Sequence, residues 1–350
     1  MTRYMPLLKA RQGELFALAD LQLATRRGVL PLLDVVPSDA ADPESVKDSC
    51  RKTVERLAKA WTDPVLLDGG LLDLTLDLGG ARGPVFELAE HARAAGLQAI
   101  PVLRVSDGVL ARTDAAAACA TDGRGLGIRL EGDDLYEEDP DDLVESVADV
   151  LEQVGVNRGE ADLVLDVGVV DGEVDAKRAA RVVLPILRGL PALEDYRSVT
   201  VAGGAFPKDL SGFAPWSLGR RARFDAVLYD RIVSRKLPRT PDFGDYAVTH
   251  PILQTGAAFA PPPQLRYTVE AEWLVLKGSR NDERGHAQFF DICEQVRELP
   301  EFAGPALGNA DARIADPRSY GKGNGSTWRQ VATTHHLDLV VRRLATLGEP

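Results

Sequence analysis

Charged residues recur directly after short apolar runs in the sequence, at positions where their side chains could bind a ligand or do chemistry. They are Lys9, Asp34, Asp68, Arg104, Arg129 with Glu131, and Asp166. Arginine binds phosphate and carboxylate groups in a bidentate way, and lysine adds a further cation. The aspartates could hold Mg²⁺, orient hydroxyl groups or act as acid and base. This mixed set is suited to a phosphorylated ligand or nucleotide, although the same charges could also form structural ion pairs with each other.

The sequence lacks the usual signatures of zinc and serine chemistry. Its five histidines show no HExxH pattern, and Cys50, Cys119 and Cys293 lie far apart. The GxSxG motif of serine hydrolases is absent. His335 and His336 are adjacent, so on a helix they point about 100° apart and cannot both face one metal. We therefore predict no zinc site, and Mg²⁺ only if the aspartates serve a hydrolase.

A glycine-rich stretch, Lys322–Ser326 (KGNGS), precedes the last helical pattern of the chain. It resembles a phosphate-binding loop only loosely, because it lacks the GxxxxGK[ST] order. We therefore interpret it as a flexible loop.

The strand-end charges are set in a repeating pattern, in which apolar runs of strand length alternate with helical periodicity. The predicted strands are Tyr4–Lys9, Val29–Val36, Pro64–Asp68, Ala99–Val105, Leu126–Glu131, Asp162–Val167, Ser198–Gly203 and Tyr246–His250. Helical patterns follow the strands, from Glu14–Leu23 after the first to Pro207–Leu218 after the seventh. This alternation predicts an α/β fold, and eight units favour a closed (β/α)8 TIM-like barrel over an open sheet. The carboxyl ends of barrel strands form the ligand-binding face, so the charges should share that face.

The pattern changes after about residue 224. Leu265–Gly278 predicts a strand or hairpin, Gly304–Thr327 is rich in Gly, Asn and Asp, and Trp328–Thr346 predicts a closing helix. We predict a single domain over residues 1–350, because α/β barrels often take about 250 residues as one unit. The barrel core would cover about residues 1–255, and an elaborated C-terminal cap with the closing helix about 256–350.

Composition limits the possible partners and the compartment. The formal net charge of −12 and the pI near 5.0 exclude a protein whose whole surface binds nucleic acid, but they allow a local basic pocket. No apolar run reaches the roughly 18 residues of a membrane span, and no signal peptide precedes the first strand. Together with the odd number of cysteines, this predicts a cytoplasmic protein without membrane contact.

Several short motifs occur in a characteristic order along nearly the whole chain. They are Tyr4–Lys9 (YMPLLK) with Gly13-Glu14, Val29–Asp34 (VLPLLD), Pro101–Arg104 (PVLR), Phe243–Tyr246 (FGDY) with His250-Pro251, Arg266–Thr268 (RYT), Trp273–Gly278, and Trp328 with His335-His336. The set resembles the beta protein family, which is named after a phage protein. The resemblance implies recurrent positions at Lys9, Asp34, Arg104, Asp245, Tyr246, Arg266, Tyr267, Lys277, Trp328 and His336. At Lys277 the family pattern leads us to expect a more Arg-like residue, which weakens the case for bidentate anion binding there.

The resemblance implies a role in phage–host conflict but little defined chemistry. Our first hypothesis is a phage-related or antiphage-defence protein whose barrel mouth binds an anionic, phosphate- or nucleotide-like ligand or a protein partner in a complex. The predicted ligand-binding residues are Lys9, Arg104, Arg129, Asp245, Tyr246, Arg266, Tyr267, Lys277 and His336.

Two alternatives remain at this stage. The first is a metal-assisted hydrolase or phosphodiesterase with Asp34, Asp68 and Asp166 as catalytic candidates around a divalent ion. The second is a structural subunit of a larger assembly. The hydrolase gains if the three carboxylates converge on a site for a metal. It fails if each of them pairs with Lys9, Arg104 or Arg129 and the barrel mouth is plugged.

Overall fold

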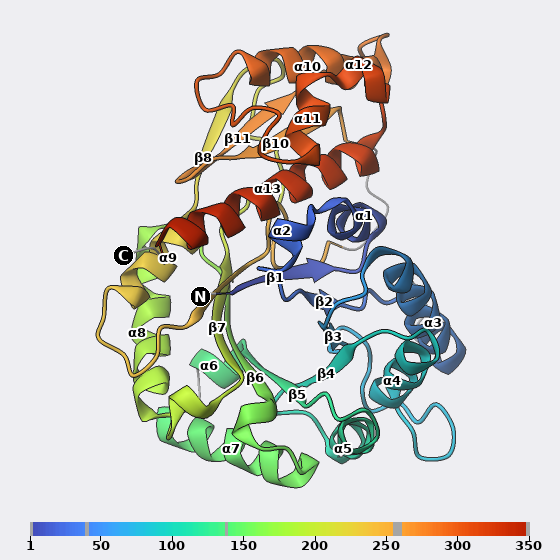
Figure 1. Cartoon of the computed structure of the whole chain (residues 1–350), viewed down its shortest axis with the longest axis vertical. Coiled ribbons are helices and arrows are strands. Elements are labelled where there is room, and N and C mark those ends of the chain that lie inside the picture. The colour runs from blue at the N-terminus through green and yellow to red at the C-terminus, as the bar shows by residue number, and fades with distance from the viewer. Residues whose placement is uncertain (1–2, 39–41, 137–138, 255–260, 348–350) are drawn as a thin grey trace.

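The computed structural model describes residues 3–38, 42–136, 139–254 and 261–347, and its N-terminal part is a closed barrel of parallel strands (Figure 1). The barrel strands, in order, are β1 (Tyr4–Lys9), β2 (Leu32–Asp34), β3 (Val65–Asp68), β4 (Ala99–Leu103), β5 (Leu126–Glu131), β6 (Ala161–Val169), β7 (Ser198–Gly204) and β9 (Asp242–Asp245). Pairing of Tyr4 in β1 with Phe243 in β9 closes the ring. The predicted (β/α)8 barrel is thereby confirmed, and the open sheet is excluded.

Helices surround the barrel (Figure 1). They are α1 (Gln12–Asp20), α2 (Leu23–Arg26), α3 (Pro43–Ala60), α4 (Pro84–Ala94), α5 (Val109–Asp122), α6 (Asp133–Tyr136), α7 (Pro140–Val154), α8 (Glu173–Gly189) and α9 (Phe224–Val233). Local sequence fixes some of their starts: Asp42 accepts a hydrogen bond from Ser45 N at 3.0 Å, and Pro43 occupies the first turn of α3. Among the described helices, none combines the length and the apolar sequence that crossing a membrane requires.

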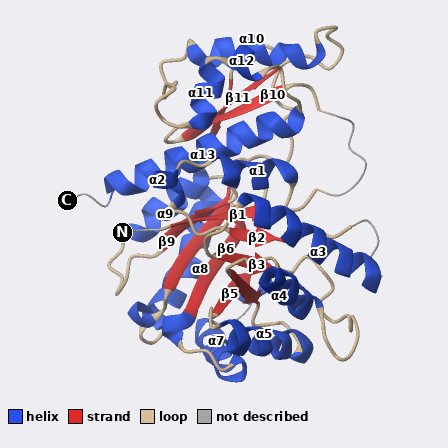
Figure 2. Cartoon of the chain, turned by 45° about the vertical axis from the view of Figure 1, so that its right-hand side comes forward, coloured by secondary structure: helices blue, strands red, loops and turns tan. Residues whose placement is uncertain are grey.

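The C-terminal part adds a small antiparallel sheet beside the barrel (Figure 2). Its strands lie in the order β10 (Gln264–Thr268), β11 (Glu272–Lys277) and β8 (Gly219–Ala222), covered by α10 (Gln288–Arg297), α11 (Asn309–Ala315) and α12 (Pro317–Tyr320). The pairing of β10 with β11 confirms the predicted hairpin. Trp273, Phe289 and Trp328 are each 1% exposed and form the core of this part.

The long helix α13 (Gly325–Leu347) joins the two parts. Near its start, Trp328 and Val331 pack into the core of the small sheet. Nearer its end, Leu337 and Val340 pack with barrel residues of β1 and α1. One helix therefore fixes the small sheet against the barrel, while the boundary near residue 255 stays a prediction.

Two sequence predictions fail in the last third of the barrel, and one strand there was not predicted. The last barrel strand is Asp242–Asp245, and the predicted strand at 246–250 is a loop. This strand has only four residues and no apolar run, so period and composition could not reveal it. Residues 207–218 form turns where a helix was predicted, and the helix after β7 is α9. Strand β8 was missed because it pairs with β11 outside the barrel.

Candidate functional site

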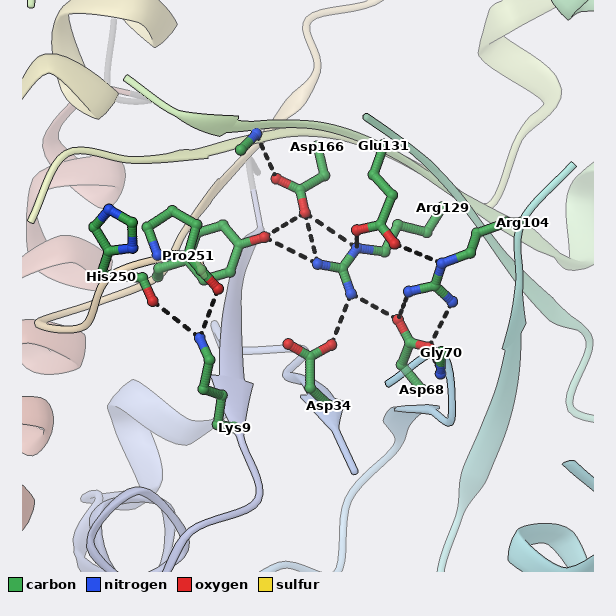
Figure 3. Close-up of polar contacts among 12 residues, drawn as sticks. Lys9, Asp34, Asp68, Gly70, Arg104, Arg129, Glu131, Asp166, His250 and Pro251 are labelled. Carbon is green, nitrogen blue, oxygen red and sulfur yellow. Dashed lines mark hydrogen bonds and ion pairs between the residues drawn. The ribbon is translucent and has the colours of Figure 1, made fainter. Parts of the chain in front are cut away.

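Arg129 lies among carboxylates that come from neighbouring strands at the carboxyl end of the barrel (Figure 3). Its Nη1 donates to Asp34 Oδ1 and Asp68 Oδ2, each at 2.7 Å. Its Nη2 donates to Asp166 Oδ2 at 2.6 Å, and its Nε lies 3.0 Å from Glu131 Oε2. The structure thus brings the strand-end charges together, with a guanidinium group at their centre.

Arg104 follows β4 and forms a bidentate pair in the same group. Its Nη1 and Nη2 donate to Asp68 Oδ1 and Oδ2 at 2.8 and 3.0 Å, and its Nε donates to Glu131 Oε1 at 2.5 Å. Gly70 makes room for this pair, since a Cβ at that position would lie 2.0 Å from Arg104 Nη1. We call the group the Arg129 cluster. It contains Asp34, Asp68, Arg104, Arg129, Glu131 and Asp166, together with Tyr246, whose hydroxyl accepts from Arg129 Nη2 and donates to Asp166.

Ionisation in the Arg129 cluster is governed by its two arginines. Burial alone would raise the pKa of Asp68, but the guanidinium groups of Arg104 and Arg129 outweigh burial and hold the pKa below its ordinary value. Burial raises the pKa of Asp34, and the attraction of Arg129 offsets part of this effect. The Arg129 guanidinium occupies the space between Asp34, Asp68 and Asp166 that a metal ion would need. The residues present therefore do not fit Mg²⁺ there, and no group among the described residues is arranged to hold a metal.

Lys9 connects the Arg129 cluster to a second charged region. Its Nζ lies 5.2 Å from the centre of the Tyr246 ring and donates to the carbonyl oxygens of His250 and Pro251 at 3.0 and 2.9 Å (Figure 3). The side chain is buried, and burial lowers the pKa of its ammonium group. On its other side Lys9 lines a cavity.

This cavity, of about 530 Å³, lies between the barrel mouth and the C-terminal part. The end of β1 and the start of α1 contribute to one wall, and β10, α10 and the start of α13 contribute to others. Its charged lining consists of Lys9, Arg11, Lys208, Arg266 and Arg329 against a single acid, Glu14. We call this region the basic cavity.

Arg266 and Arg329 are the least compensated charges of the basic cavity. Arg266 donates to the Val248 carbonyl at 2.5 Å and stacks on the Phe206 ring at 4.5 Å, but no described carboxylate lies within 4 Å of either arginine. Burial lowers the pKa of the Arg266 guanidinium, and the nearby charge of Arg329 lowers it further. Burial likewise lowers the pKa of Arg329, with Glu14 acting against it. Since arginine stays charged in proteins, both positive charges lack a matching counter-charge.

Glu14 is the acid of the basic cavity, and it lies in the first turn of α1. It is 3% exposed, and its Oε2 has no hydrogen-bond partner among the described residues. Burial raises the pKa of Glu14 to about 7, although Arg329, Lys9 and Arg11 act against the shift. Its carboxyl group therefore faces the cavity as a group that can carry a proton near neutral pH.

Two helices begin at the wall of the basic cavity. Gln12 and Gly13 of α1 line it, as do Gly325 and Ser326 of α13. A Cβ on Gly13 would lie 3.0 Å from Arg329 Cγ and 3.1 Å from Ser326 O, so the glycine allows the two helix starts to approach closely. The first N–H groups of a helix lack partners within it, and they favour anions nearby.

Other residues predicted to bind a ligand lie away from the basic cavity. Asp245 is buried and accepts from the Tyr4 hydroxyl and from Arg223, and its Oδ2 lies 2.8 Å from His336 Nε2. Tyr267 is buried and donates to Asp311 at 2.8 Å. Lys277 donates to the Leu210 carbonyl at 2.7 Å. These residues hold the small sheet, α13 and the barrel together.

Of the predicted ligand-binding residues, Lys9 and Arg266 line the basic cavity. Sequence reasoning missed Arg11, Glu14, Lys208 and Arg329 as candidates. A weak signal existed, because Gly13-Glu14 and Trp328 were among the family motifs. Of the stretch Lys322–Ser326, interpreted as a loop, residues 322–324 lie outside helices and strands, whereas Gly325 and Ser326 begin α13 at the cavity wall.

The chain is similar to one protein family and to several solved structures. A family model described as "Beta protein" matches residues 4–342. No curated protein matches the chain. Among solved structures, a mutant tryptophan synthase alpha-subunit from Pyrococcus furiosus is 14% identical, with a TM-score of 0.40 over 71% of this chain and 90% of that one. A triosephosphate isomerase from Bartonella henselae is 13% identical, with a TM-score of 0.37 over 70% and 92%.

A GH18 chitinase from Pseudoalteromonas aurantia is 14% identical, with a TM-score of 0.34. The match covers 46% of this chain and 66% of the chitinase chain. These likenesses concern the fold alone.

Proposed function

The chain belongs to the beta protein family, and from that premise we propose that it binds an anionic ligand in the basic cavity at the mouth of its barrel. The observation that carries the proposal is the charge balance: among the described residues, five basic side chains and one acid line a cavity of about 530 Å³. Concave sites of this size take small molecules, and a few charged groups fix the ligand's orientation.

The position of the basic cavity also supports ligand binding. Ligands of (β/α)8 barrels bind at the carboxyl ends of the strands, where Lys9 ends β1. An arginine without a carboxylate partner is costly to enclose, and an anion from solution would supply the missing charge. A ligand that binds only the folded protein therefore stabilises the fold as it occupies the site.

The hydrolase alternative receives no comparable support. Its three carboxylates, Asp34, Asp68 and Asp166, each accept a hydrogen bond from Arg129, so the guanidinium group balances part of their charge. We assign the Arg129 cluster a structural role instead, with Lys9 between it and the basic cavity. The further alternative, a subunit of a larger assembly, is tested by the native mass of the purified protein.

The proposal is tested by thermal unfolding in sodium sulfate, with sodium chloride at equal ionic strength as the reference. The wild-type Tm is expected to rise more in sulfate than in chloride. In Arg329→Met and in Arg266→Met this difference should fall to the part that sulfate gives any protein through its exclusion from the surface. Arg220→Met is the matched control, since Arg220 is an exposed arginine of the C-terminal part that pairs with Glu272 and Glu301. An equal response of all four proteins would reject the basic cavity as the anion site.

We place this binding in phage–host conflict, which is the setting that the family resemblance implies, and in the cytoplasm. Bacteria that carry the gene should resist phage, or a phage that carries it should need it to grow. Either effect should require an intact basic cavity. The measurement is the efficiency of plating with the wild type, Arg329→Met and Arg220→Met at equal protein levels. Loss with Arg329→Met alone supports this setting, whereas unchanged plating with all three contradicts it.

A further inference from the structure

Glu14, the single acid among the described residues that line the basic cavity, lies near several cations but forms no ion pair with them. Arg329 and Lys9 are near enough to influence its charge, yet no described cation lies within 4 Å of its carboxylate oxygens. Its Oε2 is buried without a hydrogen-bond partner in the described part of the chain. A buried carboxyl oxygen without a partner costs free energy, so such a group normally has a role that the protein alone does not reveal.

The other donors around Glu14 suit an oxyanion with several acceptor oxygens. Arg266 and Arg329 each present a fork of N–H donors. Arg266 Nη1 donates to the Val248 carbonyl, whereas the Arg329 guanidinium donates to no described residue. The first turn of α13 adds the N–H group of Gly325, which lines the same space, whereas the Ser326 N–H already donates to Asn324 Oδ1 at 2.9 Å. A phosphate group carries about two negative charges and three acceptor oxygens, and it binds both to arginines and to helix starts.

One part of the cavity wall is apolar. Pro261, Pro262 and Pro263 contribute to it, together with Phe289 and Trp328, whose rings stack with their centres 4.7 Å apart. The cavity volume of about 530 Å³ is many times the share of one water, about 30 Å³. A lone inorganic ion would leave this wall uncovered, whereas an organic group attached to the ion would lie against it.

We propose that the basic cavity binds a phosphate monoester, with the phosphate held by Arg266, Arg329 and the start of α13, and with Glu14 in its acid form donating a hydrogen bond to a phosphate oxygen. The organic group of the ester lies along the proline wall. This inference rests on the proposed anion binding and adds the class of ligand and the role of Glu14 as a positioning residue.

The protonation state of Glu14 explains how an acid can lie beside the bound anion. In the acid form Glu14 is neutral and donates, while in the ionised form it repels the phosphate. The charged and titratable groups around it are Arg11 beside α1, Lys9 on β1, Asp34 on β2, Arg266 on β10 and Arg329 on α13. His250 and His286 also line the cavity. Binding should therefore weaken as Glu14 loses its proton with rising pH.

The test is calorimetric titration of the full chain with sodium sulfate, whose charge stays constant between about pH 6 and about pH 8.5. The wild-type Kd is expected to rise at least about 10-fold over this range, because two unit charges near 5 Å apart repel by more than about 1.4 kcal/mol at protein interiors. In Glu14→Gln the Kd should rise less than about 3-fold, since the amide keeps a donor at all pH values. Glu44→Gln, which changes an exposed glutamate in the first turn of α3, should behave as the wild type.

The organic part of the ligand is tested at one pH with adenosine 5′-monophosphate and ribose 5-phosphate as probes. At least one of them is expected to bind about 10-fold more tightly than sulfate and to compete with it. Equal pH dependence in the wild type and Glu14→Gln would overturn the role of Glu14. Binding of sulfate without tighter binding of either ester would overturn the monoester. Failure of sulfate to bind at all would instead reject the proposed anion binding itself.

Discussion

Two groups of charged residues meet at the mouth of this barrel, and they differ in how their charges are balanced. The Arg129 cluster joins two arginines to four carboxylates through direct hydrogen bonds and ion pairs. The basic cavity gathers five cations around one carboxylate, and its arginines have no described carboxylate within 4 Å. Lys9 lies between the two regions, against the Tyr246 ring on one side and the cavity on the other.

The difference shows what each region can do. A buried charge that is paired inside the protein fixes the structure, and little of it remains to act on a ligand. A partly buried charge without a partner raises the free energy of the protein until something binds to it. Charge at a strand end therefore does not by itself mark a binding site, and the bonding partners of each charge decide its role.

The largest expected effect comes from removing the central guanidinium group of the Arg129 cluster. Arg129→Met should lower the free energy of unfolding by about 3–5 kcal/mol, because Asp34, Asp68 and Asp166 would be left buried without a counter-charge. Urea denaturation at neutral pH measures this loss. Arg51→Met is the control: Arg51 forms exposed pairs with Asp48 and Glu55, and its loss should change stability by about 0.5 kcal/mol or less. A similar small change in both variants would contradict the structural role.

A smaller effect is expected at Glu14, and it depends on pH. The folded-state pKa of about 7 lies above the ordinary value of 4.5, so the unfolded chain ionises first as pH rises. Stability from Glu14 is thus complete below about pH 4.5 and lost by about pH 7. Glu14→Gln does not titrate, so relative to the wild type it should gain roughly 2 kcal/mol between about pH 5 and about pH 8. Urea denaturation over this range measures the gain, and a constant difference between the two proteins would refute it.

The smallest effect on stability is expected for an arginine of the basic cavity. Arg329→Met should leave the free energy of unfolding unchanged or raise it by up to about 1 kcal/mol, because a charge without a partner is removed while the apolar stem is kept. The same urea denaturation in low-salt buffer measures it. Arg129→Met should therefore lose about 3–5 kcal/mol of unfolding free energy, whereas Arg329→Met should lose none. A loss above about 2 kcal/mol would mean that Arg329 has a structural partner after all.

Sequence could predict the barrel because seven strands are apolar runs separated by helical patterns. It missed the eighth, Asp242–Asp245, since two aspartates and a glycine fill a four-residue strand. It identified the charged strand ends, but it could not tell that Arg129 bonds to Asp34 from a strand 95 positions away. The same limit applies to Arg329, which looks like any helical arginine until α13 is placed against α1.

The basic cavity itself is tested most directly by locating a heavy oxyanion in a crystal. Selenate is a tetrahedral dianion like sulfate, and selenium gives an anomalous signal that marks its position. We predict a strong peak in the cavity, within hydrogen-bond distance of the Arg266 and Arg329 guanidinium groups, that is absent in Arg329→Met. Peaks confined to the outer surface or to the Arg129 cluster, with none in the cavity, would contradict the account.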